Sequence, residues 1–230
     1  MNKNWMRLCR EGDDGYSRRY FPATAFGLLC FAMGFAGPAA AQQGGGFYYK
    51  YVQAAYIFGE YDFADVDVDV KGYELTAQFE MTPSLILGIS YSSLEGDDTV
   101  TNAGGSQTLT FDGSGPDVYA FYHSPLGAQT EFLIGARVDM SQFEGAVRGQ
   151  EPSIEQSEDE NLLFAGLRYR LNALEFEAQW DYNLDAENNE DEWSYTLGLV
   201  SGVPGSLQLG FKIAPDDRGD LMGVFLRQAY

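Results

Sequence analysis

Leu174-Glu175-Phe176-Glu177-Ala178-Gln179-Trp180-Asp181-Tyr182-Asn183 is the stretch that decides the fold of this chain. Its even positions are apolar or aromatic, and its odd positions are acids or amides. Because side chains alternate between the two faces of a strand, the segment predicts a strand with one apolar face and one strongly charged face. At about ten residues, it also has the length of a tilted strand that crosses a bilayer.

Similar alternating segments recur along the chain and predict ten strands. We expect them within residues 47–58, 72–81, 85–93, 108–123, 130–140, 163–171, 174–183, 193–199, 207–213 and 222–230. In 108–123 the apolar phase before Gly113-Ser114-Gly115 disagrees with the phase after it, which predicts a bulge or a break there. If this strand or the last hairpin is misassigned, eight strands are the alternative.

The connections between these segments fall into two sets. One set is short and uncharged, at 82–84, 124–128, 172–173 and 202–205. The other is longer and rich in acids, at 60–70, 95–107, 142–159, 185–191 and 215–219. Short periplasmic turns and longer outer loops are typical of barrels in the bacterial outer membrane.

The composition of the two strand faces favours a barrel in lipid over a soluble one. Lipid offers backbone amides no hydrogen-bond partners, so a β protein spans it only as a closed sheet. The apolar face is crowded with Phe, Trp, Tyr and Leu, too many large side chains for the inside of a barrel of this size. We therefore predict an all-β fold, a closed antiparallel transmembrane β-barrel. Aromatic residues near strand ends fit interfacial girdles: Tyr91, Trp180, Tyr182, Trp193, Tyr195 and Tyr230.

The N-terminal segment predicts export. Arg18 and Arg19 precede the apolar core 23–37, and Ala39-Ala40-Ala41 gives a small-residue cleavage pattern. This is typical of a secretory signal peptide, cut near Ala41. A true anchor helix is the alternative, but the apolar run is short and includes glycines and a proline. We expect residues 1–41 to be signal peptide and leader, 42–46 a flexible leader, and 47–230 the barrel domain.

Two further features of the sequence concern partners and redox chemistry. Both cysteines, Cys9 and Cys30, lie in the predicted presequence, so the predicted barrel domain has neither a disulfide nor a thiol nucleophile. The formal charge is −20, from 14 Lys/Arg and 34 Asp/Glu. Such an acidic chain argues against nucleic acid as a partner. The twin-arginine pattern at 17–21 serves folded cargo, whereas a barrel crosses the inner membrane unfolded, so we read it as coincidental.

The chain resembles the small outer-membrane β-barrel proteins of Gram-negative bacteria, the group with the OmpA transmembrane domain and OmpX. The resemblance covers residues 47–230. It rests on Tyr51-Val52-Gln53-Ala54-Ala55-Tyr56 at the barrel start, on the alternating hairpins, and on a last strand that ends in Tyr230. Gln228 stands where many members have a second aromatic. The resemblance implies a location in the cell outer membrane after passage through the periplasm, with the barrel-assembly machinery, membrane lipid and lipopolysaccharide as partners.

The charged face of the strands predicts a network inside the barrel. Its expected members are Glu74, Glu131, Arg137, Asp139, Arg168, Arg170, Glu175, Glu177, Asp181, Lys212 and Arg227. In one interpretation these charges pair across the interior and close it. In the other they line a narrow aqueous path that prefers cations, because acids are in excess. The first is favoured, since side chains nearly fill barrels of eight to ten strands.

Enzyme chemistry and metal binding find little support in the sequence. Families of outer-membrane hydrolases use a histidine, and here the single one, His123, precedes a periplasmic turn, where we expect an interfacial side chain. Asp65, Asp67 and Asp69 share one face of an extended segment and form a possible weak cation site. Strand spacing of roughly 7 Å is too wide for all three to bind one ion. We predict a non-enzymatic barrel without a cofactor, with a structural or surface-interaction role. A cation-preferring pore and an outer-membrane hydrolase are the alternatives.

Overall fold

The structure, a computed structural model, describes residues 47–62, 67–102, 105–147, 154–185, 193–202, 207–216 and 219–230. The predicted signal peptide and leader, residues 1–46, lie outside the described residues, as does Asp65. In the described part of the chain, no helix is long and apolar enough to cross a membrane.

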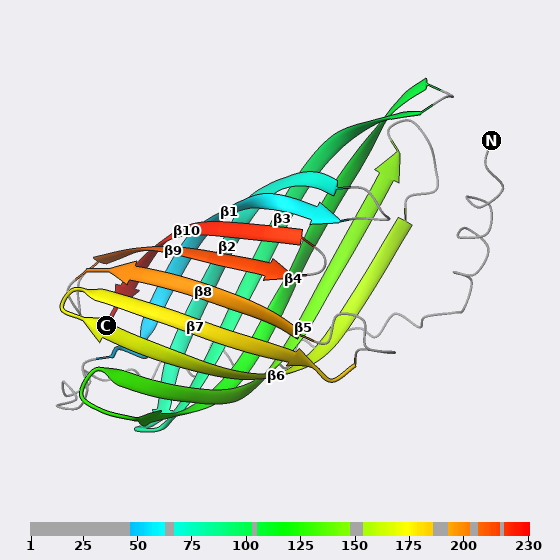
Figure 1. Cartoon of the computed structure of the whole chain (residues 1–230). Coiled ribbons are helices and arrows are strands. Elements are labelled where there is room, and N and C mark those ends of the chain that lie inside the picture. Colours follow the sequence, from blue (N-terminus) through cyan, green and yellow to red (C-terminus); the bar gives the residue numbers. More distant parts are fainter. Residues whose placement is uncertain are drawn as a thin grey trace. The chain divides into compact units, whose positions relative to one another are not determined.

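Ten antiparallel strands form one closed barrel, in which each strand pairs with its neighbours in sequence and β1 also pairs with β10 (Figure 1). The strands are β1 (Tyr51–Asp62), β2 (Asp67–Thr82), β3 (Leu85–Asn102), β4 (Gly105–Pro125), β5 (Thr130–Val147), β6 (Ile154–Leu171), β7 (Leu174–Asn183), β8 (Trp193–Ser201), β9 (Leu207–Asp216) and β10 (Gly219–Ala229). The prediction of a closed barrel with ten strands is confirmed. We call the end with the short connections the turn end and the opposite end the loop end.

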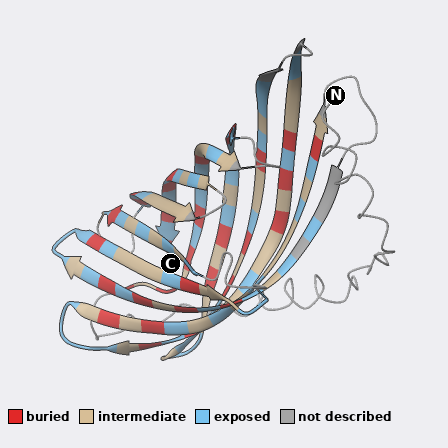
Figure 2. Cartoon of the chain, turned by 45° about the vertical axis from the view of Figure 1, so that its right-hand side comes forward, coloured by how far each residue is buried: buried red, intermediate tan, exposed pale blue. Residues whose placement is uncertain are grey.

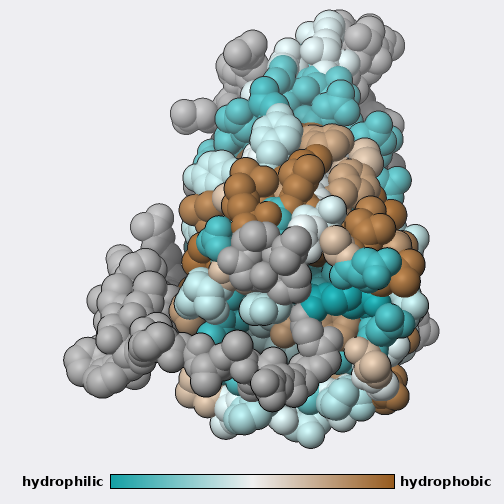
Figure 3. All heavy atoms as spheres, turned by 90° about the vertical axis from the view of Figure 1, so that its left-hand side faces the viewer, coloured by the Kyte–Doolittle hydropathy of each residue, from teal (hydrophilic) through white to brown (hydrophobic). Residues whose placement is uncertain are grey.

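The two faces of the wall have the predicted chemistry. Phe176, Trp180 and Phe211 are 43%, 47% and 39% exposed on the outer face, whereas Glu175 is 4% exposed and faces inward. Burial alternates along the strands in the same way (Figure 2). On the wall visible in Figure 3, apolar side chains gather in a band, and polar side chains lie beyond it towards the upper end.

Several strands are longer than predicted. The segments 95–107 and 142–159 were expected as loops, but β3 and β4 pair as far as Asn102 and Gly105, and β5 and β6 as far as Gly145 and Ile154. Likewise, β1 and β2 continue into the segment 60–70. Strand ends that project into water do not need an apolar outer face. The alternating pattern that identifies a membrane strand in the sequence therefore ends earlier than the strand itself.

The prediction of a bulge or a break in the fourth strand is wrong, because β4 is continuous, although its pairing with β5 skips Gly115 and Pro116. The register of β4 with β3 and β5 is the same on both sides of Gly113-Ser114-Gly115. The apparent change of phase has another cause, because Phe111, Tyr119 and Phe121 all point into the barrel. Large aromatic residues therefore do not mark the outer face of this strand.

Glycines on neighbouring strands make room for these inward aromatic rings. Gly88 of β3 lies opposite Tyr119 of β4, and Gly210 of β9 lies opposite Phe225 of β10. A Cβ atom at either glycine would overlap the facing ring. The rings therefore lie flat over the backbone of the neighbouring strand, which lets a narrow barrel hold them.

We expect Gly88→Val to destabilise the barrel by roughly 1–3 kcal/mol, because the new side chain must displace the ring of Tyr119 from a filled interior. The urea midpoint of the folded barrel in detergent micelles measures this loss. Gly127→Val is the matched control, because a Cβ at Gly127 meets no atom within 4 Å. In the double variant with Tyr119→Ala, the cost of Gly88→Val should shrink. Equal midpoints for the two valine variants would contradict this packing.

Candidate functional site: the barrel interior

The segment that precedes β1 packs inside the barrel at the turn end. The first strand was predicted to start at residue 47, but β1 starts at Tyr51, and Phe47 and Tyr49 are buried in the mouth of the barrel. The guanidinium carbons of Arg168 and Arg170 lie 4.9 Å and 4.7 Å from the centre of the Phe47 ring. These cation–π contacts hold the segment against the wall.

Tyr49 connects this segment to the only histidine of the chain. Its hydroxyl donates a hydrogen bond to Glu131, and its ring centre lies 4.1 Å from that of His123. His123 Nδ1 in turn lies 3.7 Å from Glu131 Oε1. The expectation of an interfacial His123 is wrong: the residue has the inward phase of β4 and is 8% exposed. The same phase error that predicted the bulge explains this miss.

The middle of the interior is a network of ion pairs. Arg168 pairs with Glu175 and with Glu177, the latter at 3.3 Å, and Arg170 pairs with Glu175. Arg227 joins the same two acids, with Nη1 3.1 Å from Glu177 and 3.8 Å from Glu175. Hydrogen-bonded pairs of this kind offset the cost of removing each charge from water.

Arg227 also links strands that are far apart in the sequence. Its Nε donates to Gln53 Oε1 of β1 at 3.0 Å, and its guanidinium carbon lies 4.2 Å from the centre of the Tyr51 ring. Through these contacts the last strand is joined to the first strand and, through Glu177, to β7. The network therefore spans the interior from wall to wall.

A second group of charges lies nearer the loop end. Arg137 Nε is 3.4 Å from Asp117, and Arg137 Nη2 is 3.5 Å from Asp181. Lys212 donates to both carboxylate oxygens of Glu74 at 2.8 Å. These contacts join strands that are not neighbours in the barrel, since Glu74 lies on β2 and Lys212 on β9.

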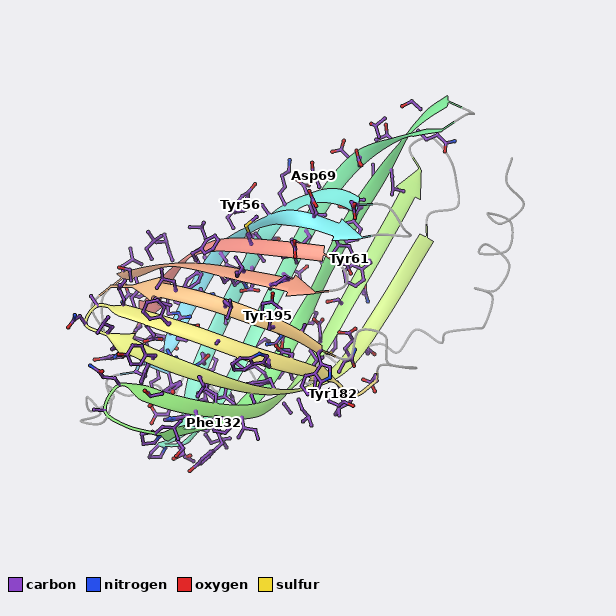
Figure 4. All side chains as sticks on the ribbon, in the orientation of Figure 1. Tyr56, Tyr61, Asp69, Phe132, Tyr182 and Tyr195 are labelled. Atoms are coloured by element: carbon purple, nitrogen blue, oxygen red, sulfur yellow. The ribbon has the colours of Figure 1, made fainter. Side chains whose placement is uncertain are left out.

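An apolar cluster fills the interior at the loop end. Tyr61, near the end of β1 (Figure 4), has its ring centre 5.0 Å from Phe111 and 5.7 Å from Phe143. Val68 and Val70 of β2 pack in the same cluster and are almost fully buried. Rings from β1, β4 and β5 thus meet inside the barrel at the loop end.

Every predicted member of the charge network lies on the inward phase of its strand. Asp139 differs from the rest in its partner, because it accepts a hydrogen bond from Ser141. The predicted network did not include Asp117, Gln53 or the inward tyrosines. Asp117 and Tyr119 lie in the strand whose phase was misread, and the prediction considered only charged residues as members.

The possible cation site does not assemble among the described residues. Asp67 and Asp69 are exposed on β2, and Asp69 lies opposite another acid, Glu60, in the register with β1. No group of three or more His, Cys, Asp or Glu residues in the described ranges could hold a metal ion.

The family of the chain follows from a sequence comparison. Residues 26–213 match the model of the outer membrane protein beta-barrel domain. The chain belongs to this family. It is thus an outer-membrane β-barrel protein, and the outer face described above is the lipid-facing face. No curated protein matches the chain.

Solved structures of outer-membrane proteins are similar to the chain at low sequence identity. The translocator domain of the autotransporter NalP from Neisseria meningitidis is 11% identical, with 89% of this chain and 93% of that chain covered and a TM-score of 0.48. The transport unit of the autotransporter AIDA-I from Escherichia coli is 11% identical, with 90% and 96% covered and a TM-score of 0.45. The N-terminal β-barrel domain of Pseudomonas aeruginosa OprF is 13% identical, with 80% and 100% covered and a TM-score of 0.33.

We expect Arg168→Met to lower the free energy of unfolding of the barrel by about 3 kcal/mol, because it leaves Glu175 and Glu177 short of a buried cation. Urea titration in detergent micelles measures the change. Lys71→Met is the matched control, since Lys71 and Glu95 form an exposed pair at 3.9 Å. Its effect should stay below about 1 kcal/mol. A loss for Arg168→Met no larger than the control would show that the interior pairs do not stabilise the fold.

Proposed function

We propose that the protein is a non-enzymatic outer-membrane barrel with a closed interior, which acts at the cell surface through its projecting strands. The observation that carries the proposal is the series of three barriers along the interior. Phe47 and Tyr49 lie at the turn end, ion pairs cross the middle, and the cluster of Tyr61, Phe111 and Phe143 lies at the loop end.

The energetics of these barriers support a closed interior. An ion that entered the middle layer would have to compete with Arg168 and Arg227 for Glu177, whose pairs are already formed at 3.3 Å and 3.1 Å. It would also have to pass an apolar cluster that cannot replace its hydration shell. The cation-preferring pore would need both barriers to open together, so it is the weaker candidate.

The position of His123 also supports a role without catalysis. Outer-membrane hydrolases of the kind considered above would need a histidine at the outer rim. Here His123 is buried at the turn end beneath Tyr49, away from the loop end.

Planar-bilayer recording of the refolded barrel is the direct test of the closed interior. We expect no steady single-channel steps, because a hydrated ion would have to pass all three barriers. A general porin inserted under the same conditions serves as the control for insertion and detection. Steady steps with cation selectivity would overturn the closed interior and favour the pore.

The proposal also places the loop end outside the cell. Because Cys9 and Cys30 lie in the predicted signal peptide, single-cysteine variants of the barrel give a clean test. We expect a membrane-impermeant maleimide to label Ser106→Cys, at the loop end of β4, on intact cells. Leu126→Cys, which is exposed in a short turn, should react only after the outer membrane is opened. The reverse pattern would show the opposite orientation.

A further inference from the structure

The strand β6 projects beyond its neighbour on one side. Its pairing with β5 continues to Ile154, whereas its pairing with β7 starts only at Leu162. Figure 1 shows this part of β6 running well past the end of β7. At about 3.3 Å per residue, the segment 154–161 extends roughly 25 Å along the strand. Among the described residues, no strand pairs with residues 154–160 on the side away from β5.

Hydrogen bonds show which backbone groups face the free side. Arg170 N donates to Gln129 O, so the even positions of β6 point their amides towards β5. Asn161 lies on the opposite phase, since its carbonyl accepts from Leu184 N at 2.8 Å and its amide donates to Asp185 Oδ2 at 2.7 Å. By the same alternation, Ser157 and Asp159 direct their N–H and C=O groups away from β5, and both residues are exposed.

Unpaired strand edges are templates for another strand, and proteins normally guard them. Here negative charge can protect the edge from unwanted pairing, because the sequence of the segment 154–161 contains Glu155, Glu158, Asp159 and Glu160. A second copy of this chain that paired edge to edge would place one acidic segment beside another, which is unfavourable. The edge thus repels itself, but its charge suits an extended segment with basic side chains.

We propose that the projecting edge of β6 binds an extended, basic peptide segment of a partner protein by adding it as a further strand. In this mode of recognition, backbone hydrogen bonds provide affinity and alternate side chains provide specificity. The carboxylate of Asp159 is exposed, so a basic side chain of the added strand can meet an acid beside the unpaired backbone. The inference rests on the proposed surface role and names the partner class for it.

The test uses the full barrel in nanodiscs and a short fluorescent peptide in which Lys and Thr alternate. Fluorescence anisotropy measures binding at low salt. We expect saturable binding, with little binding of an otherwise identical peptide in which Glu replaces Lys. A third peptide keeps every lysine but has Pro at alternate positions, so it keeps the charge but cannot pair as a strand. It should bind much more weakly.

Variants of β6 separate the backbone from the charge. Ser157→Pro removes an outward amide without removing a bond to β5, and we expect about tenfold weaker binding. Ser157→Ala is the matched control, because it keeps the amide, and it should bind as the wild type does. Asp159→Asn should weaken binding and make it less dependent on salt.

The outcomes are distinct. Equal binding of the two basic peptides, or no effect of Ser157→Pro, would show attraction to charge alone and overturn strand addition. Absence of binding to any peptide would also overturn it, as would dimers of the barrel that Ser157→Pro abolishes. Failure of the proposed function is seen separately, as steady conductance in the bilayer recordings, and that result is independent of the peptide measurements.

Discussion

Lipid cannot form hydrogen bonds with a peptide group, and the rest of this structure follows from that constraint. Each strand must pair on both sides where it crosses the bilayer, so β1 must meet β10 and the sheet must close. Once the sheet is closed, its two faces lie in different environments. The outer face touches acyl chains, and the inner face must satisfy its own polar groups within a narrow space.

The interior solves this second problem with two kinds of packing. In the middle, arginines and acids satisfy each other, because Arg168 reaches Glu177 from the neighbouring strand β6 and Arg227 reaches it from β10. Towards both ends, aromatic rings fill the space, and glycines such as Gly88 give them room against the wall. Ion pairs and aromatic rings thus take up much of the interior at membrane depth. The variable parts of the barrel are the strand ends that leave the membrane.

The sequence predicted the fold well because the solvent contrast leaves a simple signal. Phe176 and Trp180 alternate with Glu175 and Glu177. Only a strand with its aromatic face towards lipid and its acidic face towards the interior keeps the aromatic residues out of water and the acids out of lipid. The alternation of apolar and polar residues gave a wrong prediction where the two faces of a strand do not differ in polarity. In β4, the rings of Tyr119 and Phe121 are as stable in a filled interior as in lipid, so the phase could not be read from composition.

The interior site could be predicted only in part. Charged residues on the inward phase were identifiable, but their partners depend on how far neighbouring strands are staggered, which sequence patterns do not contain. The projecting edge of β6 was missed for a related reason. Beyond the bilayer, both faces of a strand meet water, so an acidic strand such as the segment 154–161 has the composition of a loop.

The contacts of Arg227 have a consequence for how the barrel completes itself. A slip of one residue between the first and last strands would turn every side chain of β10 to the other face. It would bury Arg227 in acyl chains and take it away from Gln53 and Glu177, while Leu226 entered the charged middle. Arg227 thus favours the correct register between β1 and β10, since only that register closes the barrel without placing a charged guanidinium in lipid.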